Sequence, residues 1–386
     1  MRILLGLTYY RPYVSGLTIY VERLGNALAE RGHQVTILTS HYESNLAREE
    51  FVDGIRIIRV PVAARVSKGV IMPTLGYWAT KLTRENDVLS LHLPQFDAAG
   101  IALRGRMFKR PTILTYHCDL QLPPGPFNKI VDETVYAANF SAAQLADKIV
   151  AYTQDYANHS RLLRRFAGKI EIIPPPVVMP EPEPAAVEVF RSAHDLHGKR
   201  VLGYAARFAA EKGVEVLIDG MPELLKRYPN LKVLFAGPYR NVLGEEEYWH
   251  RLAPRIEALG DHWEFVGTLS GEQLSPFYAS LDSLLVTSVN STESFGLVQV
   301  EAMLCGTPVV ASNLPGVRQP VTMTGMGEVV AIGSTPALVD GIDCVLADRE
   351  RYIRPRLEIE ALFDLQVTVR KYEELFEREI KRKSAA

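Results

Sequence analysis

Short apolar runs of strand length alternate with helical patterns along almost the whole chain. Ile3 to Leu7 has the length of a buried strand, and the apolar residues between Leu17 and Leu28 recur at helical spacing. This alternation predicts α/β architecture with parallel sheets. Further strands are expected at residues 35–39, 54–62 (as a hairpin with the stretch around residue 51), 87–93, 112–116, 148–151, 171–173, 200–204, 231–236, 263–266, 283–287, 307–311 and 328–332.

A proline-rich segment divides this series. Residues 173–184 contain six prolines between Ile173 and Pro184, which forbid a helix and favour an extended linker. A chain of 386 residues also exceeds one ordinary core. We therefore predict domains at residues 1–180 and 181–363, followed by a charged C-terminal helix at residues 364–386.

Charge and cysteine content exclude several classes of protein. The net charge of −2 gives no overall attraction for a nucleic acid. Cys118, Cys305 and Cys344 are far apart and form no zinc or disulfide pattern, which fits a reducing compartment. No apolar run reaches the length of a membrane span, and the N-terminal apolar run is too short for a signal peptide. We expect a cytoplasmic protein.

The segment at residues 291–312 has the strongest chemical content. A buried strand leads into a loop that ends at Phe295 and Gly296, and a short helix follows. The free backbone N–H groups of such a helix start can hold a phosphate, which glycine allows to approach closely. Glu293 precedes the helix and Glu301 lies within it, so a bound diphosphate would lie between them. The spacing alone equally fits two surface glutamates near a helix N-terminus, where negative charge is favourable.

Two cations follow the first strand of the second domain. Arg207 and Lys212 lie in a loop before the helical pattern that starts at Val214. Fixed cations there would stabilise the charge that develops on a diphosphate leaving group. A solvated loop in which Glu211 pairs with its neighbours is the alternative.

The first domain offers two candidates at strand ends. Gly16 stands between the first strand and its helix, and His117 follows the strand at residues 112–116. Carboxyl ends of parallel strands line the ligand crevice of such sheets. His92 occupies a comparable strand end and is a weaker candidate for acceptor contact, as is Asp119. A turn glycine and a structural histidine are the alternatives.

The phrase from Glu293 to Ala311 resembles the E-x7-E signature of retaining GT-B glycosyltransferases of glycosyltransferase family 4. The segment at residues 203–213 is similar to the family's phosphate loop, with Ala206 where glycine is common, and Ser15 replaces the first glycine of its N-terminal loop. The resemblance implies two Rossmann-like domains facing a central cleft, with the C-terminal helix packing back on the first. It implies donor-sugar contacts for Glu293 and His117, a ribose contact for Glu301, diphosphate binding by Arg207 and Lys212, and donor contacts from Gly16, Phe295, Gly296 and Leu297.

The expected function is therefore transfer of a hexose-type sugar from a UDP- or GDP-sugar to an acceptor hydroxyl, with retention of configuration, in cell-envelope glycan or glycolipid synthesis. The chain has no Asp-x-Asp triplet for a nucleotide-bound metal, so we expect no metal and no other cofactor. A nucleotide-sugar epimerase and a non-catalytic nucleotide-sugar binder remain alternatives. The missing G-x-G-x-x-G makes a dehydrogenase a poorer fit.

Two basic clusters leave peripheral membrane contact open. Arg104, Arg106, Lys109 and Arg110 form the first; Arg161, Arg164, Arg165 and Lys169 form the second, among Leu162, Leu163 and Phe166. The second resembles an interfacial helix, and a solvated basic face is the alternative. Attachment at the inner face of the membrane would favour a lipid-linked acceptor. In the C-terminal helix, pairs four residues apart are expected at Glu374–Arg378, Glu377–Lys381 and Glu379–Lys383.

Overall fold

The computed structural model of the protein describes residues 1–66, 69–121, 125–242, 244–269 and 271–385. The chain forms two compact units. Unit 1 comprises Met1–Pro176 and Leu365–Ala386, and unit 2 comprises Val177–Asp364. Each unit contains its own sheet and hydrophobic core, as the alternating sequence pattern predicts.

Unit 1 is built on an eight-stranded sheet with the order β10-β9-β8-β7-β1-β2-β4-β3. All neighbouring strands are parallel except the β3–β4 hairpin, which is antiparallel as expected around Phe51. Its strands are β1 (Arg2–Gly6), β2 (Gln34–His41), β3 (Glu49–Val52), β4 (Ile55–Pro61), β7 (Val88–Leu93), β8 (Thr112–Tyr116), β9 (Lys148–Ala151) and β10 (Ile170–Ile172), and a separate antiparallel pair consists of β5 (Ala64–Val66) and β6 (Gly69–Ile71).

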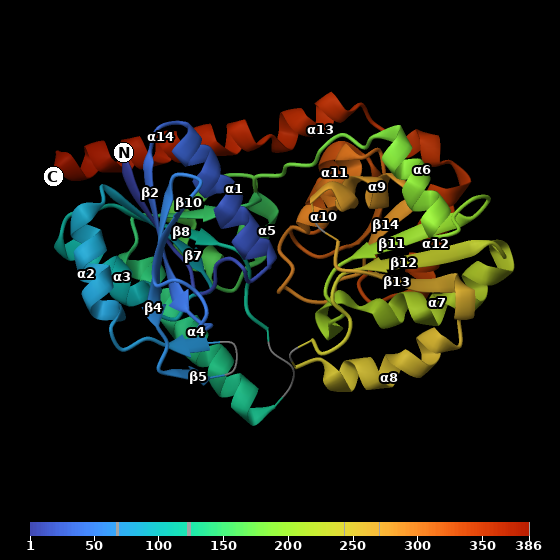
Figure 1. The fold of residues 1–386 in the computed structure, drawn as a ribbon, viewed down its shortest axis with the longest axis horizontal. Coiled ribbons are helices and arrows are strands. Elements are labelled where there is room, and N and C mark those ends of the chain that lie inside the picture. The colour runs from blue at the N-terminus through green and yellow to red at the C-terminus, as the bar shows by residue number, and fades with distance from the viewer. Residues whose placement is uncertain (67–68, 122–124, 243, 270, 386) are drawn as a thin grey trace. The chain divides into compact units, whose positions relative to one another are not determined.

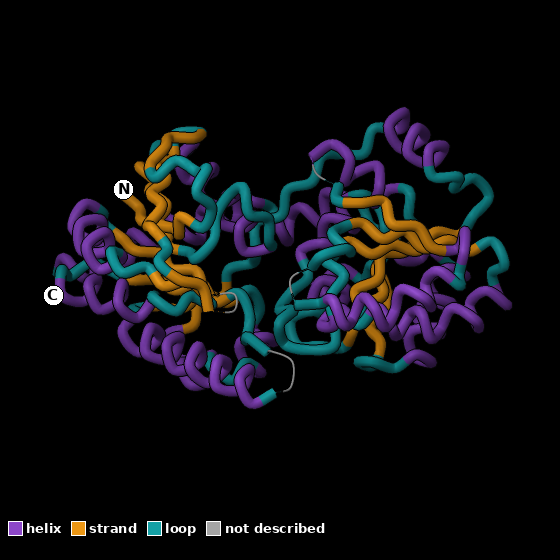
Figure 2. The backbone as a smooth tube through the Cα atoms, turned by 60° about the horizontal axis from the view of Figure 1, so that its bottom comes forward, coloured by secondary structure: helices purple, strands orange, loops and turns teal. Residues whose placement is uncertain are grey.

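Helices cover both faces of this sheet (Figures 1 and 2). Leu4 and Leu89 belong to a core shared with α2 and α3, whereas Leu5 points to the opposite face and lies against Gly25 of α1. This alternation along each strand is what a sheet buried on both faces requires. The helices of unit 1 are α1 (Gly16–Glu30), α2 (Leu75–Glu85), α3 (Ala98–Met107), α4 (Pro126–Leu145), α5 (Gln154–His159), the 3-10 helix η1 (Leu163–Lys169) and α14 (Leu365–Ser384).

The C-terminal helix α14 packs on α1 within unit 1, which confirms the predicted return of the chain to the first domain (Figure 1). Val369, Tyr372 and Phe376 form its fully buried stripe. The predicted ion pairs are mostly wrong, because of the three only Lys381–Glu377 forms among the described residues. Arg378 instead contacts Glu171 of β10, and Lys383 contacts Asp147, the residue before β9. Glu379 pairs with Arg378 and Arg382 of its own helix.

Unit 2 is built on a six-stranded, fully parallel sheet with the order β13-β12-β11-β14-β15-β16. Its strands are β11 (Arg200–Ala205), β12 (Leu231–Ala236), β13 (Trp263–Gly267), β14 (Ser283–Val286), β15 (Val309–Ser312) and β16 (Gly327–Val330). Its helices are α6 (Pro184–Ala193), α7 (Val214–Arg227), α8 (Glu246–Glu257), α9 (Leu274–Ala279), α10 (Leu297–Leu304), α11 (Gln319–Thr324), α12 (Thr335–Ala347) and α13 (Arg356–Phe363), with 3-10 turns at η2 (Ala210–Lys212), η3 (Gly260–His262), η4 (Gly271–Gln273) and η5 (Arg349–Tyr352).

Strand β15 starts two residues later than the sequence predicts. The backbone N–H of Thr307 donates to Ala302 and so ends helix α10, and Pro308 has no N–H to donate. The Pro308 carbonyl accepts from the Leu284 N–H, but the first N–H that can donate across to the β16 side is that of Val309, which donates to Met326.

Candidate functional site

Two loops of unit 2 are joined at the carboxyl edge of its sheet. One connects β11 to α7 and the other connects β14 to α10, and these strands are neighbours. The Thr287 hydroxyl donates to the Lys212 carbonyl at 2.7 Å, and the Val289 N–H donates to the Glu211 carbonyl at 3.0 Å. Gly213 has φ +62°, and a side chain there would meet the Thr287 carbonyl oxygen. The sequence thus fixes the two loops against each other.

The predicted cations lie on these joined loops, each with an acidic partner. Lys212 Nζ is 2.5 Å from a carboxylate oxygen of Glu293, and Arg207 contacts Glu211 at 2.7 Å. Lys212 and Glu293 keep one fifth of their side-chain surface exposed, and Arg207 is more exposed still. The structure therefore brings Lys212 and Glu293 together, and the local pairing of Glu211 that the sequence left open also occurs.

The start of helix α10 presents backbone rather than side chains. Gly296 is the residue before the helix, with φ +76°, and as a glycine it supplies no side-chain cap. A side chain at this position would collide with Gln299, whose amide donates to the carbonyls of Phe295 and Val317. The Phe295 ring is buried against Phe363, so only its backbone can face a ligand. Leu297 is the first helical residue.

Glu301 projects from the buried side of α10. It is 7% exposed, and one of its oxygens accepts a hydrogen bond from the Tyr278 hydroxyl at 3.0 Å. Burial of a carboxylate is costly unless its oxygens find donors. Tyr278 supplies one such donor and orients the group.

In unit 1, Gly16 is the first residue of α1. Ser15 caps this helix, and its hydroxyl accepts from the Thr18 N–H at 3.2 Å. Serine is a preferred N-cap because its side chain satisfies a helix N–H that has no backbone partner. Ser15, the departure from the family's glycine, thus stabilises the start of α1.

His117 lies in a buried pair with His92. His117 Nε2 and His92 Nδ1 are 3.0 Å apart, and the Tyr152 hydroxyl contacts His117 Nδ1. Both ring nitrogens of His117 are thus engaged within unit 1. Burial lowers the pKa of His92 to about 3 and holds the pKa of His117 well below its usual range, with a smaller contribution from His92. Both imidazoles are neutral at physiological pH.

The two weaker candidates of unit 1 hold other residues in place. His92 is fully buried and contacts His117, which places it behind that residue rather than at a surface. Asp119 accepts hydrogen bonds from the Tyr116 and Ser160 hydroxyls at 2.8 and 2.9 Å. Their positions at strand ends were readable from the sequence, but their partners were not.

The second basic cluster has no interfacial helix. Leu162 and Leu163 are fully buried, and Phe166 packs on Phe140 in the core of unit 1. Lys169 donates to three carbonyls at the end of α4. The apolar residues therefore face inward, and the alternative of a solvated basic face describes this segment.

The sequence reasoning missed four site residues, Thr287, Gln299, Tyr152 and Tyr278. Each acts through a hydrogen bond to a group from another element, as described above. Thr287 and Tyr152 carried a signal, because Thr287 ends the strand expected at residues 283–287 and Tyr152 follows the strand expected at residues 148–151. Over the described ranges of the chain, no three His, Cys, Asp or Glu side chains gather as a metal site would need, and no helix is both long and apolar enough to span a bilayer.

Comparisons with known proteins agree with this geometry. Residues 187–357 match the family described as glycosyl transferases group 1, and residues 14–179 match Glycosyltransferase Family 4. The phosphatidyl-myo-inositol mannosyltransferase of Mycobacterium tuberculosis is 26% identical over 368 residues, covering 92% of this chain and 90% of that protein. The 2-deoxystreptamine N-acetyl-D-glucosaminyltransferase of Streptomyces fradiae is 27% identical over 363 residues, covering 88% and 84%.

A solved structure supports the same fold. Anabaena HepE in complex with UDP-glucose superposes with a TM-score of 0.78 at 19% identity, over 98% of this chain and 100% of that chain. The two family matches together span most of both units, and each unit has the predominantly parallel α/β sheet described above. The chain is an enzyme of the GT-B fold and belongs to glycosyltransferase family 4.

Proposed function

We propose that this glycosyltransferase moves a hexose-type sugar from a nucleoside-diphosphate sugar, UDP- or GDP-linked, to an acceptor hydroxyl with retention of configuration. One observation carries the proposal. Arg207, Lys212 and the glycine start of α10 occupy one edge of the unit 2 sheet, on two loops that hydrogen-bond to each other. Two cations beside a helix N-terminus match the charge of a diphosphate.

The ion pairs compensate the charges of Arg207 and Lys212 before a diphosphate binds. A bound diphosphate would take over Arg207 and Lys212 from Glu211 and Glu293, the partners they have here. Glu293 would then be available to accept hydrogen bonds from sugar hydroxyls, and Glu301 from the ribose. Because negative charge grows on the leaving phosphate as the sugar bond breaks, both cations stabilise the transition state more than the ground state.

Retention without a covalent intermediate is the proposed course of the reaction. His117 is neutral and hydrogen-bonded on both ring nitrogens, so it offers no ready nucleophile or base. The leaving phosphate oxygen would accept the proton of the acceptor hydroxyl. With two side-chain cations on the diphosphate, the reaction would need no metal ion.

The proposed acceptor follows from the enzymes that this chain resembles. One similar enzyme is named for phosphatidyl-myo-inositol and another for 2-deoxystreptamine, an anionic lipid and an amine-bearing ring. Both contain a cyclitol ring with free hydroxyls. We propose a cyclitol or sugar acceptor in envelope glycan or glycolipid synthesis, with the enzyme cytoplasmic and attached peripherally to the inner face of the membrane where the acceptor is a lipid.

A donor screen tests the proposal. Thermal shift against UDP- and GDP-sugars should select one donor, and NMR of the product formed with a cyclitol acceptor should show the donor's anomeric configuration, with unchanged rates in EDTA. An inverted product would refute retention. Epimerised donor without acceptor would establish the epimerase, and donor binding without consumption by any acceptor would establish the binding protein.

A further inference from the structure

Unit 1 contains a cavity of about 660 Å³ at the carboxyl ends of β2 and β4. These two strands are parallel neighbours and end side by side, at His41 and Pro61. The cavity is completed by the loop after β2 and by the segment that leads into β5. Its volume suits a small-molecule group, and it lies at the sheet edge where α/β proteins bind ligands.

The charged lining of this cavity is entirely basic. Arg48 and Arg65 line it together with His41 and Ser44, and no carboxylate is among its described lining residues. The whole chain carries more acids than lysines and arginines, so this local excess does not follow from composition. Two guanidinium groups and a hydroxyl are the donor types that recognise phosphate.

Neighbouring acids do not neutralise the two arginines. Glu49 contacts Arg56 at 2.7 Å, and Glu50 contacts Arg59 at 2.6 Å. Within the described ranges the Arg48 guanidinium has no hydrogen bond or ion pair, while its backbone is held by the Arg59 N–H at 2.8 Å. Arg48 is therefore an anchored residue whose charge remains available to an anion.

Arg65 connects the cavity to the loop that precedes Gly16. Its guanidinium donates to the Tyr42 carbonyl, and its charge partly offsets the burial that raises the pKa of Tyr9. The Tyr42 hydroxyl in turn accepts from the Tyr13 N–H at 2.7 Å and donates to the Tyr10 carbonyl at 3.1 Å. The wall of the cavity thus holds the β1–α1 loop in place.

We propose that this cavity binds the phosphate group of the acceptor, with Arg48 and Arg65 as its ligands. The inference deepens the function proposed above and rests on it, since it chooses an anionic acceptor over an amine-bearing one. An amine would meet two like charges here. Three strand spacings separate β2 from β8, about 14 Å, so an acceptor bound by its phosphate would extend along the same sheet edge toward His117.

The test compares matched ligands on the full-length enzyme by calorimetry. The wild type should bind myo-inositol 1-phosphate at least tenfold more tightly than myo-inositol, and Arg48→Gln should remove about tenfold of that preference. Arg106→Gln, an exposed arginine at the end of α3, is the charge-matched control and should change nothing. Arg65 also supports Tyr42, so the folding of Arg65→Gln is checked by thermal unfolding. If Arg65→Gln does not fold, the test rests on Arg48→Gln alone.

Vesicle flotation distinguishes a lipid phosphate from a free, soluble phosphate. Binding to phosphatidylcholine vesicles only when they contain phosphatidylinositol, lost in Arg48→Gln, would identify a lipid phosphate, and binding of the soluble phosphate alone would identify a free one. Failure of every phosphorylated probe to bind, or equal binding by wild type and Arg48→Gln, overturns the inference. Donor binding by calorimetry is the independent readout. If phosphate binding behaves as expected while no donor binds, the proposed sugar transfer fails and the anion site stands.

Discussion

The polar side chains at the carboxyl edges of the two sheets differ in burial and charge. In unit 1, His117 and His92 are buried, neutral and hydrogen-bonded to each other. In unit 2, Arg207 and Lys212 are charged, partly exposed and paired with acids. The difference teaches that the unit 2 edge can exchange its partners for a charged ligand at low cost, whereas the unit 1 histidines form part of a fixed core.

The largest expected effect is on turnover, through the partly exposed cations of unit 2. Arg207→Ala should lower kcat about 10²–10³-fold, because it removes a cation aimed at the charge of the leaving diphosphate. Steady-state kinetics with the donor identified by the screen would measure it. Thermal unfolding should change little, since Arg207 is a partly exposed residue whose pair with Glu211 is local.

A double variant distinguishes this role from mere neutralisation of Glu211. If Arg207 serves only to balance that carboxylate, Arg207→Gln combined with Glu211→Gln should restore turnover. We expect no restoration, and Glu211→Gln alone should keep most of the activity. Near-normal turnover in Arg207→Ala would count against the whole donor assignment.

The buried histidines should instead make the stability of unit 1 depend on pH. The folded-state pKa values of His92 and His117 lie below that of an exposed histidine, about 6.5, so the unfolded chain binds more protons below that pH. Their stabilisation is present above pH 6.5 and is lost as the pH falls, for His92 down to about pH 3. Between pH 7 and pH 5 His92 alone should cost unit 1 about 2 kcal/mol, and His117 should add to that loss, as measured by hydrogen exchange of β7 and β8.

His92→Gln sharpens this expectation. The variant removes one titrating group, so near pH 5 the slope of stability against pH should fall by about one proton, or about 1.4 kcal/mol per pH unit. Amides of β11 and β12 in unit 2 provide the internal reference. An unchanged slope in β7 and β8 would show that His92 is not neutral in the folded protein.

Sequence reasoning succeeded where a signal is periodic or local. Strands such as β8 (Thr112–Tyr116) and β12 (Leu231–Ala236) have the bounds that their apolar runs predict. It failed where partners come from distant elements. The contact of Lys212 with Glu293, the pairing of His92 with His117 and the charge pairs of α14 depend on how the sheet brings loops together, which no spacing encodes.

A smaller effect is expected from the buried hydroxyls that tie α14 to unit 1. The Tyr372 hydroxyl contacts the Tyr20 hydroxyl at 2.7 Å and the Thr115 hydroxyl at 2.8 Å, all in the interior. Tyr372→Phe leaves both neighbours short of a partner and should cost about 1–2 kcal/mol in chemical denaturation. Tyr20→Phe disturbs only one of these contacts and should cost less. If Tyr20→Phe cost more than Tyr372→Phe, the Tyr372 hydroxyl would not be the main hydrogen-bonding group that ties α14 to unit 1.

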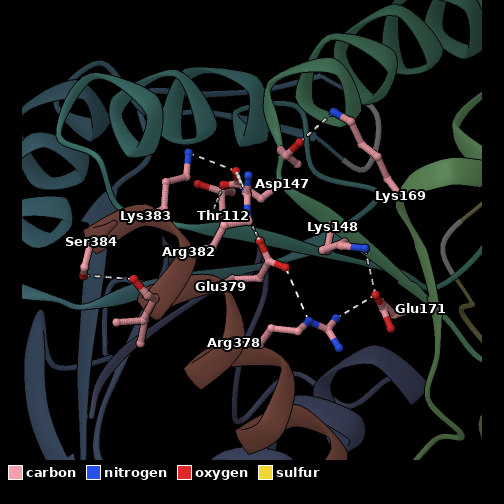
Figure 3. A network of polar contacts seen from close by, with 12 residues as sticks. Thr112, Asp147, Lys148, Lys169, Glu171, Arg378, Glu379, Arg382, Lys383 and Ser384 are labelled. Atoms are coloured by element: carbon pink, nitrogen blue, oxygen red, sulfur yellow. Dashed lines mark hydrogen bonds and ion pairs between the residues drawn. The ribbon is translucent and has the colours of Figure 1, made fainter. Parts of the chain in front are cut away.

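The smallest effect is expected at the exposed surface of the same helix. Lys381 is 80% exposed and lies 3.9 Å from Glu377, so Lys381→Ala should change stability by about 0.3 kcal/mol at most. Arg382 belongs to the network in Figure 3, where it contacts the nearly buried Glu379 at 2.7 Å and also Asp147. Arg382→Ala leaves the Glu379 carboxylate with less compensation, so its cost should clearly exceed that of Lys381→Ala. Equal costs for the two variants in denaturant titrations would mean that this network, like the Lys381 pair, contributes little, and that the buried stripe alone holds α14 on unit 1.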